Sequence, residues 1–261
     1  MSETNGERST REPASTREIS RDRYDAVLLD LDGVITDTAS IHAACWKQMF
    51  DEYLQKRATQ RREAFRPFDI ATDYRLYVDG KPRYDGVRDF LTSRGIQLPE
   101  GSPDDPPQAE TVEGLGNRKN DLVNRIIEDK GVEPYEGSVE LIRHLRHRGF
   151  KIAVVTSSQN CTAVLKAAKL DHFFDVQVDG NVIHAQHLAG KPAPDTYLMA
   201  ARLLGVEPAR AVVIEDAISG VEAGAAGNFG LVIGVARKGN AEELKHQGAH
   251  LVVKDLGELV D

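Results

Sequence analysis

Short runs of aliphatic and β-branched residues recur along the chain and are its clearest pattern. Apolar and polar residues hardly alternate within a run, which is typical of strands that are buried on both faces of a parallel sheet. We predict a strand at each run. Six such runs follow residue 22, at positions 25–30, 151–157, 174–178, 210–216, 230–236 and 250–256.

Segments with helical spacing lie between several of these runs. Residues 137–149 repeat apolar positions on one face and end at a glycine, and residues 193–206 do the same before Gly205. The alternation of strands and helices predicts an α/β fold with a mostly parallel, doubly wound sheet. The buried side of the second helix is expected to consist of Tyr197, Leu198, Ala201 and Leu204.

The segment between the first two predicted strands departs from this alternation of strands and helices. It has helical patterns at 41–54, 83–95 and 117–131 but no convincing buried strand, and residues 99–110 are rich in Pro, Asp and Glu, which indicates a mobile loop. We predict a helical domain inserted after the first strand. The expected organisation is a disordered tail over 1–22, a core domain over 23–39 and 135–261, and a cap domain over 40–134.

Composition and charge narrow the class of protein. Of the 261 residues 41% are hydrophobic, enough for a sizeable core, and the formal net charge of -8 disfavours nucleic acid and anionic membranes as partners. No apolar stretch approaches the roughly 20 residues that span a bilayer. Cys45 and Cys161 are far apart, which disfavours a disulfide framework or a zinc site. We expect a cytoplasmic monomer or weak homo-oligomer.

Two carboxylates follow the first predicted strand directly. Asp30 and Asp32 are two residues apart, so on an extended chain they face the same way, and Gly33 then allows a sharp turn. Ligands of open α/β sheets bind beyond the carboxyl ends of the strands. We therefore expect both carboxylates to point into one crevice.

Other strand ends carry matching chemistry. Thr156, Ser157 and Ser158 follow the second strand and offer hydroxyl and amide donors for phosphate oxygens. Glu215 and Asp216 follow the fourth strand and are hard oxygen ligands of the kind that Mg²⁺ takes. Lys191 adds a compact positive charge on a proline-containing loop. Each signal alone is ordinary, but the ordered set predicts phosphoryl transfer, where positioning and charge neutralisation are most of the catalysis.

These residues lie in four segments that resemble the haloacid dehalogenase superfamily, and within it the β-phosphoglucomutase-like branch. The segments are DLDGVITDT, VVTSSQN, GKPAPD and VIEDAISG, and the likeness covers nearly all of the chain after the tail. The resemblance implies a Rossmann-like core with a helical cap between the first and second segments.

The same resemblance implies roles for the core residues. Asp30 would be the nucleophile that forms an aspartyl-phosphate, and Asp32 the general acid and base. Thr156 and Lys191 would hold the transferring phosphoryl group, and Ser157 would donate through its backbone. The implied Mg²⁺ ligands are the Asp30 carboxylate, the Asp32 carbonyl and Asp216, with Glu215 in support.

For the cap, the resemblance implies substrate contacts that remain open. His42 falls where the branch keeps a histidine near the nucleophile, with Trp46 one helical turn later, and a helix histidine without a chemical role is the alternative. Lys119 and Asn120 resemble the branch's RKN stretch, or else begin a helix with surface charge.

A second, non-transferring phosphate needs ligands of its own. Arg83 is our candidate from the cap, with Ser158 and Asn160 from the core. The stretch around Arg83 departs from the usual spacing of the branch, which puts Lys81 in doubt, and Ala217 stands where a serine is frequent.

The resemblance leaves three functions open. The first is a β-phosphoglucomutase that converts β-glucose 1-phosphate into glucose 6-phosphate through the bisphosphate. The second is a phosphatase of a sugar phosphate or a similar phosphomonoester, with the same core chemistry and water as acceptor. The third, a sugar-phosphate binder without activity, could afford to lose Asp30, Asp32 or Lys191, yet all three are present.

Overall fold

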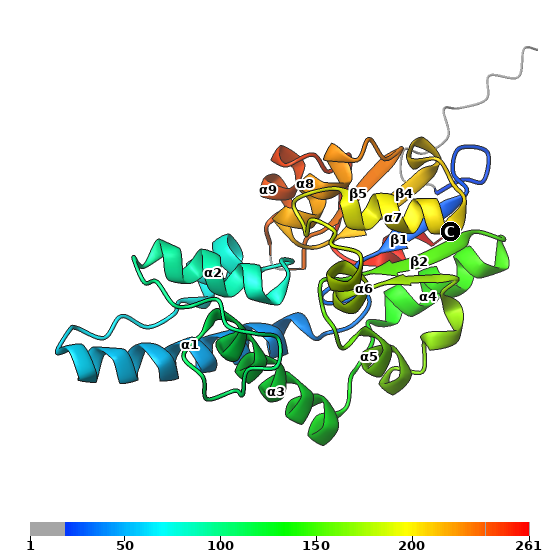
Figure 1. Ribbon diagram of the computed structural model, residues 1–261. Helices are drawn as coiled ribbons and strands as arrows, with labels where there is room; N and C mark the ends of the chain where they lie inside the picture. The colour runs from blue at the N-terminus through cyan, green and yellow to red at the C-terminus, as the bar shows by residue number, and fades with distance from the viewer. Residues whose placement is uncertain (1–18, 238, 261) are drawn as a thin grey trace, which may run out of the picture.

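The computed structural model describes residues 19–237 and 239–260, which form an α/β core and a helical cap beside it (Figure 1). The core sheet has six parallel strands in the order β3-β2-β1-β4-β5-β6, so both the predicted strands and the predicted α/β class are confirmed. The strands are β1 (Ala26–Leu29), β2 (Lys151–Val155), β3 (Val176–Val178), β4 (Ala211–Glu215), β5 (Leu231–Val235) and β6 (Leu251–Val253).

Helices cover both faces of this sheet. On one face, Val27 and Leu29 of β1 pack in a cluster with apolar side chains of α4 (Glu136–His147) and α5 (Cys161–Ala167). On the other face, Ala26 and Leu28 pack in a cluster with side chains of the later helices. This burial on both sides explains the unbroken apolar runs of the sequence. The remaining core helices are α6 (Gly180–Ala185), α7 (Asp195–Leu204), α8 (Ile218–Ala226) and α9 (Ala241–His246).

The cap has a hydrophobic cluster of its own. Four aromatic rings meet in it, with centroids of the Phe50 and Phe90 rings 4.2 Å apart and those of Phe50 and Phe68 5.1 Å apart. Trp46 stacks on Phe50 at 5.3 Å. The cap elements are α1 (Ala39–Arg61), a π-helix (Ile70–Val78), α2 (Arg83–Ser93) and α3 (Val112–Lys130).

The two crossings between the core and the cap lie side by side. The backbone N–H of Asp37 donates to the carbonyl of Glu133 at 3.0 Å, and Thr36 forms an isolated bridge with Pro134. The two chain segments that connect core and cap are therefore paired with each other. They support the division into a core and an inserted cap.

Several expectations need correction. Leu198 on α7 is 37% exposed, because the inward side of that helix is formed by Tyr197 and residues three, four and seven positions later. Residues 1–18 of the predicted tail lie outside the described residues, whereas Ile19 is 3% exposed and packs in a core cluster. The π-helix was not predicted, since its wider turn does not follow the 3.6-residue period.

The loop at 99–110 has specific contacts with α3. The side-chain amide of Asn117 donates to the carbonyls of Pro103 and Asp105, and Arg118 donates to that of Pro107 at 2.7 Å.

Within residues 19–237 and 239–260, no helix is long and apolar enough to cross a membrane.

Candidate active site

Strand β1 brings a carboxylate to the carboxyl edge of the sheet. Asp30 directly follows the strand, is 6% exposed, and donates its backbone N–H to the carbonyl of Ile214 on β4 at 3.0 Å. Gly33 then turns the chain at a φ of +93°, where an added Cβ would lie only 2.3 Å from Oδ2 of Asp216. Glycine meets both requirements. The turn thus brings the ends of β1 and β4 together.

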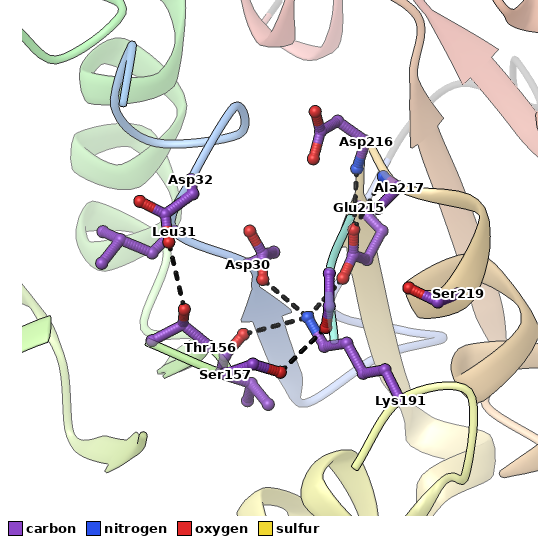
Figure 2. Close-up of polar contacts among 12 residues, drawn as sticks. Asp30, Leu31, Asp32, Thr156, Ser157, Lys191, Glu215, Asp216, Ala217 and Ser219 are labelled. Carbon is purple, nitrogen blue, oxygen red and sulfur yellow. Dashed lines mark hydrogen bonds and ion pairs between the residues drawn. The ribbon is translucent and has the colours of Figure 1, made fainter. Parts of the chain in front are cut away.

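Lys191 lies between two carboxylates of the core (Figure 2). Its Nζ is 2.6 Å from Oδ1 of Asp30 and also bonds Oε1 of Glu215, and its side chain is 1% exposed. Burial by itself disfavours the ammonium, but the two carboxylates raise the pKa of Lys191 well above its usual value. Lys191 is therefore a permanent positive charge beside Asp30.

Both carboxylate oxygens of Glu215 are bound inside the protein. Oε1 accepts from Lys191 and, at 3.1 Å, from the Tyr197 hydroxyl. Oε2 accepts the backbone N–H groups of Asp216 at 2.9 Å and Ala217 at 3.0 Å (Figure 2). Glu215 thereby positions Lys191 and shapes the loop that carries Asp216.

Three buried acids form a candidate cation site. Asp30, Glu215 and Asp216 each offer an oxygen, and these atoms lie within 4.8 Å of one another. Burial, together with the charges of Glu215, Asp32 and Asp216, raises the pKa of Asp30 well above its usual value despite Lys191. The three carboxylates carry more negative charge than Lys191 can balance. Hard oxygen donors of this kind fit a divalent cation. Asp30 and Asp216 line the cavity, so they are the carboxylates that such an ion can reach.

Asp32 is held by a chain of groups that leads into the cap. Its Oδ1 accepts from the Thr38 hydroxyl and lies 3.4 Å from Nε2 of His42. Nδ1 of His42 is 2.7 Å from Nζ of Lys119. Burial would raise the pKa of Asp32, yet His42, Thr38 and Lys119 together lower it below its usual value. Asp32 is therefore ionised and able to accept a proton.

This chain also determines the tautomer of the histidine. An ammonium group can only donate, so Nδ1 of His42 accepts from Lys119 and a neutral ring carries its proton on Nε2, toward Asp32. Burial lowers the pKa of Lys119 to about 8, while Asp32 favours its charged form. Nζ of Lys119 also lies 5.0 Å from the centroid of the Trp46 ring. His42 and Lys119, two of the predicted cap residues, thus converge on Asp32.

The loop after β2 joins the same constellation. Thr156 is 2% exposed; its hydroxyl donates to Oδ2 of Asp32 at 3.3 Å and accepts the backbone N–H of Ser158 at 3.1 Å. The side-chain amide of Asn160 donates to Oδ1 of Asn120 on α3 at 3.0 Å. Core and cap residues predicted separately are therefore in direct contact.

Arg83, at the start of α2, lies at the seam between cap and core. Its Nη2 donates to the Tyr84 hydroxyl and to Oε1 of Gln159, each at 2.8 Å. Among the residues that the structure describes, its buried Nε has no hydrogen-bond partner. Lys81 instead pairs with Asp89 of α2 at 2.6 Å, which is consistent with the doubt about its role.

A cavity of about 350 Å³ connects these groups. Lys191, Glu215 and Asn160 are predicted site residues that do not line it and lie behind the wall. The predicted residues that do line it are Asp30, Asp32, His42, Trp46, Arg83, Lys119, Asn120, Thr156, Ser157, Ser158 and Asp216.

Sequence reasoning missed several polar residues that line this cavity, among them Gln159, Tyr74 and Asp79. Gln159 stands within a recognised segment but received no role. Tyr74 and Asp79 come from the unpredicted π-helix and its end, and burial, followed by the charges of Asp79, Asp216 and Asp32, raises the pKa of Tyr74. A π-helix is rare and frequent at functional sites, but no sequence pattern of this chain indicated one.

Comparison with known proteins places this geometry in context. Residues 24–228 match the haloacid dehalogenase-like hydrolase family. The chain is 53% identical over 238 residues to the β-phosphoglucomutase of Mycobacterium tuberculosis, covering 90% of this chain and 91% of that protein. It is 30% identical over 214 residues to a fructose-1-phosphate phosphatase of Escherichia coli, covering 81% of this chain and 96% of that protein.

Solved structures agree with the fold. The crystal structure of β-phosphoglucomutase from Clostridium difficile superposes with a TM-score of 0.72 at 25% identity, over 90% of this chain and 93% of that chain.

Proposed function

Because the chain belongs to the haloacid dehalogenase-like hydrolase family, we propose that it is a phosphomutase that converts β-glucose 1-phosphate into glucose 6-phosphate. The single observation that carries the proposal is that one cavity extends from Asp30 of the core to Arg83 of the cap, which suits a sugar with a phosphate at each end. Asp30 and Thr156 line one end, with Lys191 behind them, and Arg83 of the cap offers a buried, unpaired Nε among the described residues. A mutase must hold two phosphates on one sugar, whereas a phosphatase needs to hold only one.

The reaction begins at Asp30. A carboxylate oxygen of Asp30 attacks phosphorus, the bond between phosphorus and the donor oxygen breaks, the leaving oxygen takes up a proton from solvent, and an aspartyl-phosphate forms. The Thr156 hydroxyl, which lines the cavity, would hold the phosphoryl oxygens, and Lys191, bound to Asp30 from behind the wall, would offset their negative charge. The phosphoryl group then passes to the free hydroxyl of the sugar monophosphate, and the resulting bisphosphate returns its other phosphate to Asp30.

Asp32 moves the proton in each half of the cycle. Since its pKa is lowered, it is ionised and first removes the proton of the attacking sugar hydroxyl. It returns a proton to the leaving oxygen in the second half. The Nε2–H of His42 faces Asp32 and stabilises its negative charge, while Lys119 holds the ring in that tautomer.

The acidic donor set fits Mg²⁺. We assign the ion to the carboxylates of Asp30 and Asp216 and the backbone carbonyl of Asp32, with Glu215 positioning this set from behind. The ion, when bound, supplies positive charge that keeps Asp30 ionised and offsets charge that develops on the phosphoryl oxygens.

The test is product analysis. Purified protein is incubated with β-glucose 1-phosphate, Mg²⁺ and a trace of β-glucose 1,6-bisphosphate, and the products are separated. Glucose 6-phosphate is expected, with far less inorganic phosphate. Free phosphate without glucose 6-phosphate would reject the mutase.

A sugar-phosphate phosphatase is the second candidate. It is favoured by the likeness to the fructose-1-phosphate phosphatase, because the core groups would be the same with water as the acceptor. A panel of sugar phosphates assayed for phosphate release, without bisphosphate, tests it. A cytoplasmic location and a monomeric or weakly associated state complete the proposal and remain predictions.

A further inference from the structure

The turn between the π-helix and α2 is docked directly on the core. We call residues 79–83 the cap turn. The Ser219 hydroxyl donates to the carbonyl of Asp79 at 2.9 Å, and the Ser157 hydroxyl donates to the carbonyl of Gly80 at 2.8 Å. Two hydroxyls from separate core segments therefore bind consecutive carbonyls of the cap, and the mechanism above uses neither side chain.

The steric fit of the cap turn is close. Gly80 has a φ of +71°, and an added Cβ would lie 2.5 Å from Oγ of Ser219 and 3.1 Å from Cβ of Ala217. A Cβ at Gly190 would lie 2.1 Å from Cγ of Pro82. The turn thus contacts the core through backbone atoms and small side chains. A larger residue at any of these glycines would push the cap away.

Each docking contact lies beside a residue of the reaction. Ser157 follows Thr156, Gly190 precedes Lys191, and Ser219 is three residues after Asp216; Figure 2 shows both serines near these groups. On the cap side, the turn ends at Arg83, which donates to Gln159 of the core at 2.8 Å. The two serine contacts therefore lie at the seam between Asp30 of the core and Arg83 of the cap.

We propose that the hydroxyls of Ser157 and Ser219 are positioning groups that hold the cap turn on the core. We call this pair of hydrogen bonds the clasp. It directs the phosphoryl group of Asp30 to the sugar rather than to water. This inference rests on the proposed mutase function. In either outcome the bond between Asp30 and phosphorus breaks, and the proton of the accepting hydroxyl or water passes to Asp32. The clasp changes which acceptor can reach phosphorus, and leaves the core groups unchanged.

The experiment compares Ser157→Ala, Ser219→Ala and the double variant with the parent protein. The ratio of inorganic phosphate to glucose 6-phosphate is measured with β-glucose 1-phosphate and a trace of bisphosphate. Each single change is expected to raise this ratio about fivefold, the factor that corresponds to one ordinary hydrogen bond, and the double change to raise it further. An unchanged ratio in the double variant would overturn the proposal.

Ser138→Ala is the matched control. Its hydroxyl donates to the carbonyl of Val34 at 2.6 Å, which is the same kind of bond, but within the core. We expect this change to lower the thermal midpoint without changing the product ratio. A ratio raised as much as in the clasp variants would show that general loosening, rather than the cap turn, is responsible.

A readout independent of turnover uses Trp46, the single tryptophan of the chain. Trp46 is 3% exposed and lines the cavity between cap and core, so opening of the seam exposes it. Acrylamide quenching of its fluorescence is expected to increase in the clasp variants and to stay unchanged in Ser138→Ala. If the parent protein makes no glucose 6-phosphate, the proposed mutase function is wrong, and quenching still tests whether the two serines hold the cap turn. If quenching is unchanged in the variants, the role of the serines is wrong and the mutase function is unaffected.

Discussion

The two sides of the cavity are built in different ways. On the core side, Asp30, Lys191 and Glu215 are almost fully buried, and their partners all belong to the core itself. On the cap side, His42 and Arg83 reach the site from helices whose distance from the sheet depends on the seam. In the proposed mechanism, the core side therefore supplies phosphoryl-transfer chemistry that is common to different acceptors, and the cap side selects the acceptor.

The largest effect is expected from the nucleophile. Asp30→Asn keeps the shape of the side chain but removes its nucleophilic charge, so both phosphoryl transfer and phosphate release should fall by roughly ten-thousandfold. Activity is measured together with incorporation of labelled phosphate into the protein. If the variant keeps every activity of the parent protein, Asp30 is not the nucleophile. The chain would then be a sugar-phosphate binder, or another residue would carry out the chemistry. Circular dichroism of the variant checks that the fold is kept.

A large and selective effect is expected at Arg83. Arg83→Met removes the cation assigned to the non-transferring phosphate, so kcat/KM for the mutase should fall on the order of tenfold to a hundredfold, in line with a charge-assisted hydrogen bond. Hydrolysis of a phosphomonoester with no second anionic group should change much less. Arg146→Met is the matched control, since Arg146 is 37% exposed, pairs with Asp175 at 2.7 Å and does not line the cavity. Equal losses in both reactions would contradict this assignment.

A moderate, pH-dependent effect is expected at Lys119. The pKa of Lys119 is lowered to about 8, so the ammonium is present below that pH and is lost as pH rises through it. Without the ammonium, His42 no longer has one fixed tautomer, and kcat/KM should fall on the alkaline side. Lys119→Met should remove this alkaline fall from the pH profile of kcat/KM and lower the plateau of kcat/KM about tenfold. That factor is a small part of the usual contribution of acid–base catalysis. Lys56→Met, at an exposed ion pair of α1, should keep the parent profile.

The smallest effect is expected at the outer edge of the seam. Arg75 of the π-helix pairs with both carboxylate oxygens of Glu243 on α9, at 2.6 and 2.7 Å, and both side chains are about two-fifths exposed. An exposed pair contributes little, so Arg75→Glu should raise the ratio of phosphate to glucose 6-phosphate by about twofold or less at low salt. The double exchange with Glu243→Arg should restore the ratio. If the double exchange does not restore the ratio, this ion pair does not contribute to closure of the cap.

Much of the core side could be predicted without coordinates. Parallel strands end at one edge, so the acids after β1 and β4 were expected at the same edge, and they meet because the structure pairs β4 with β1. The buried faces of the helices were less certain, as Leu198 shows, because neighbouring positions on a helix differ by about 100° and both can be apolar. The tail prediction extended too far, because the isolated apolar residue Ile19 carries no periodic signal.

The cap side was predictable only in part. His42 and Lys119 were candidates from sequence, but their contact and its effect on Asp32 depend on how α1 and α3 pack. Tyr74 gave no sequence signal, because the π-helix has no recognisable period.

The sequence by itself determined the positions of the strands along the chain, the helical character of the segment after the first strand, and the set of acids, hydroxyls and lysine at the strand ends. These follow from local pattern and from the rule that parallel strands share a carboxyl edge. Only the tertiary structure decided that Gln159 meets Arg83 and that Ser157 and Ser219 bind the cap turn. Those contacts depend on the angle between two separately packed bodies, and a shift of a few ångströms across the seam breaks them while every local pattern stays the same.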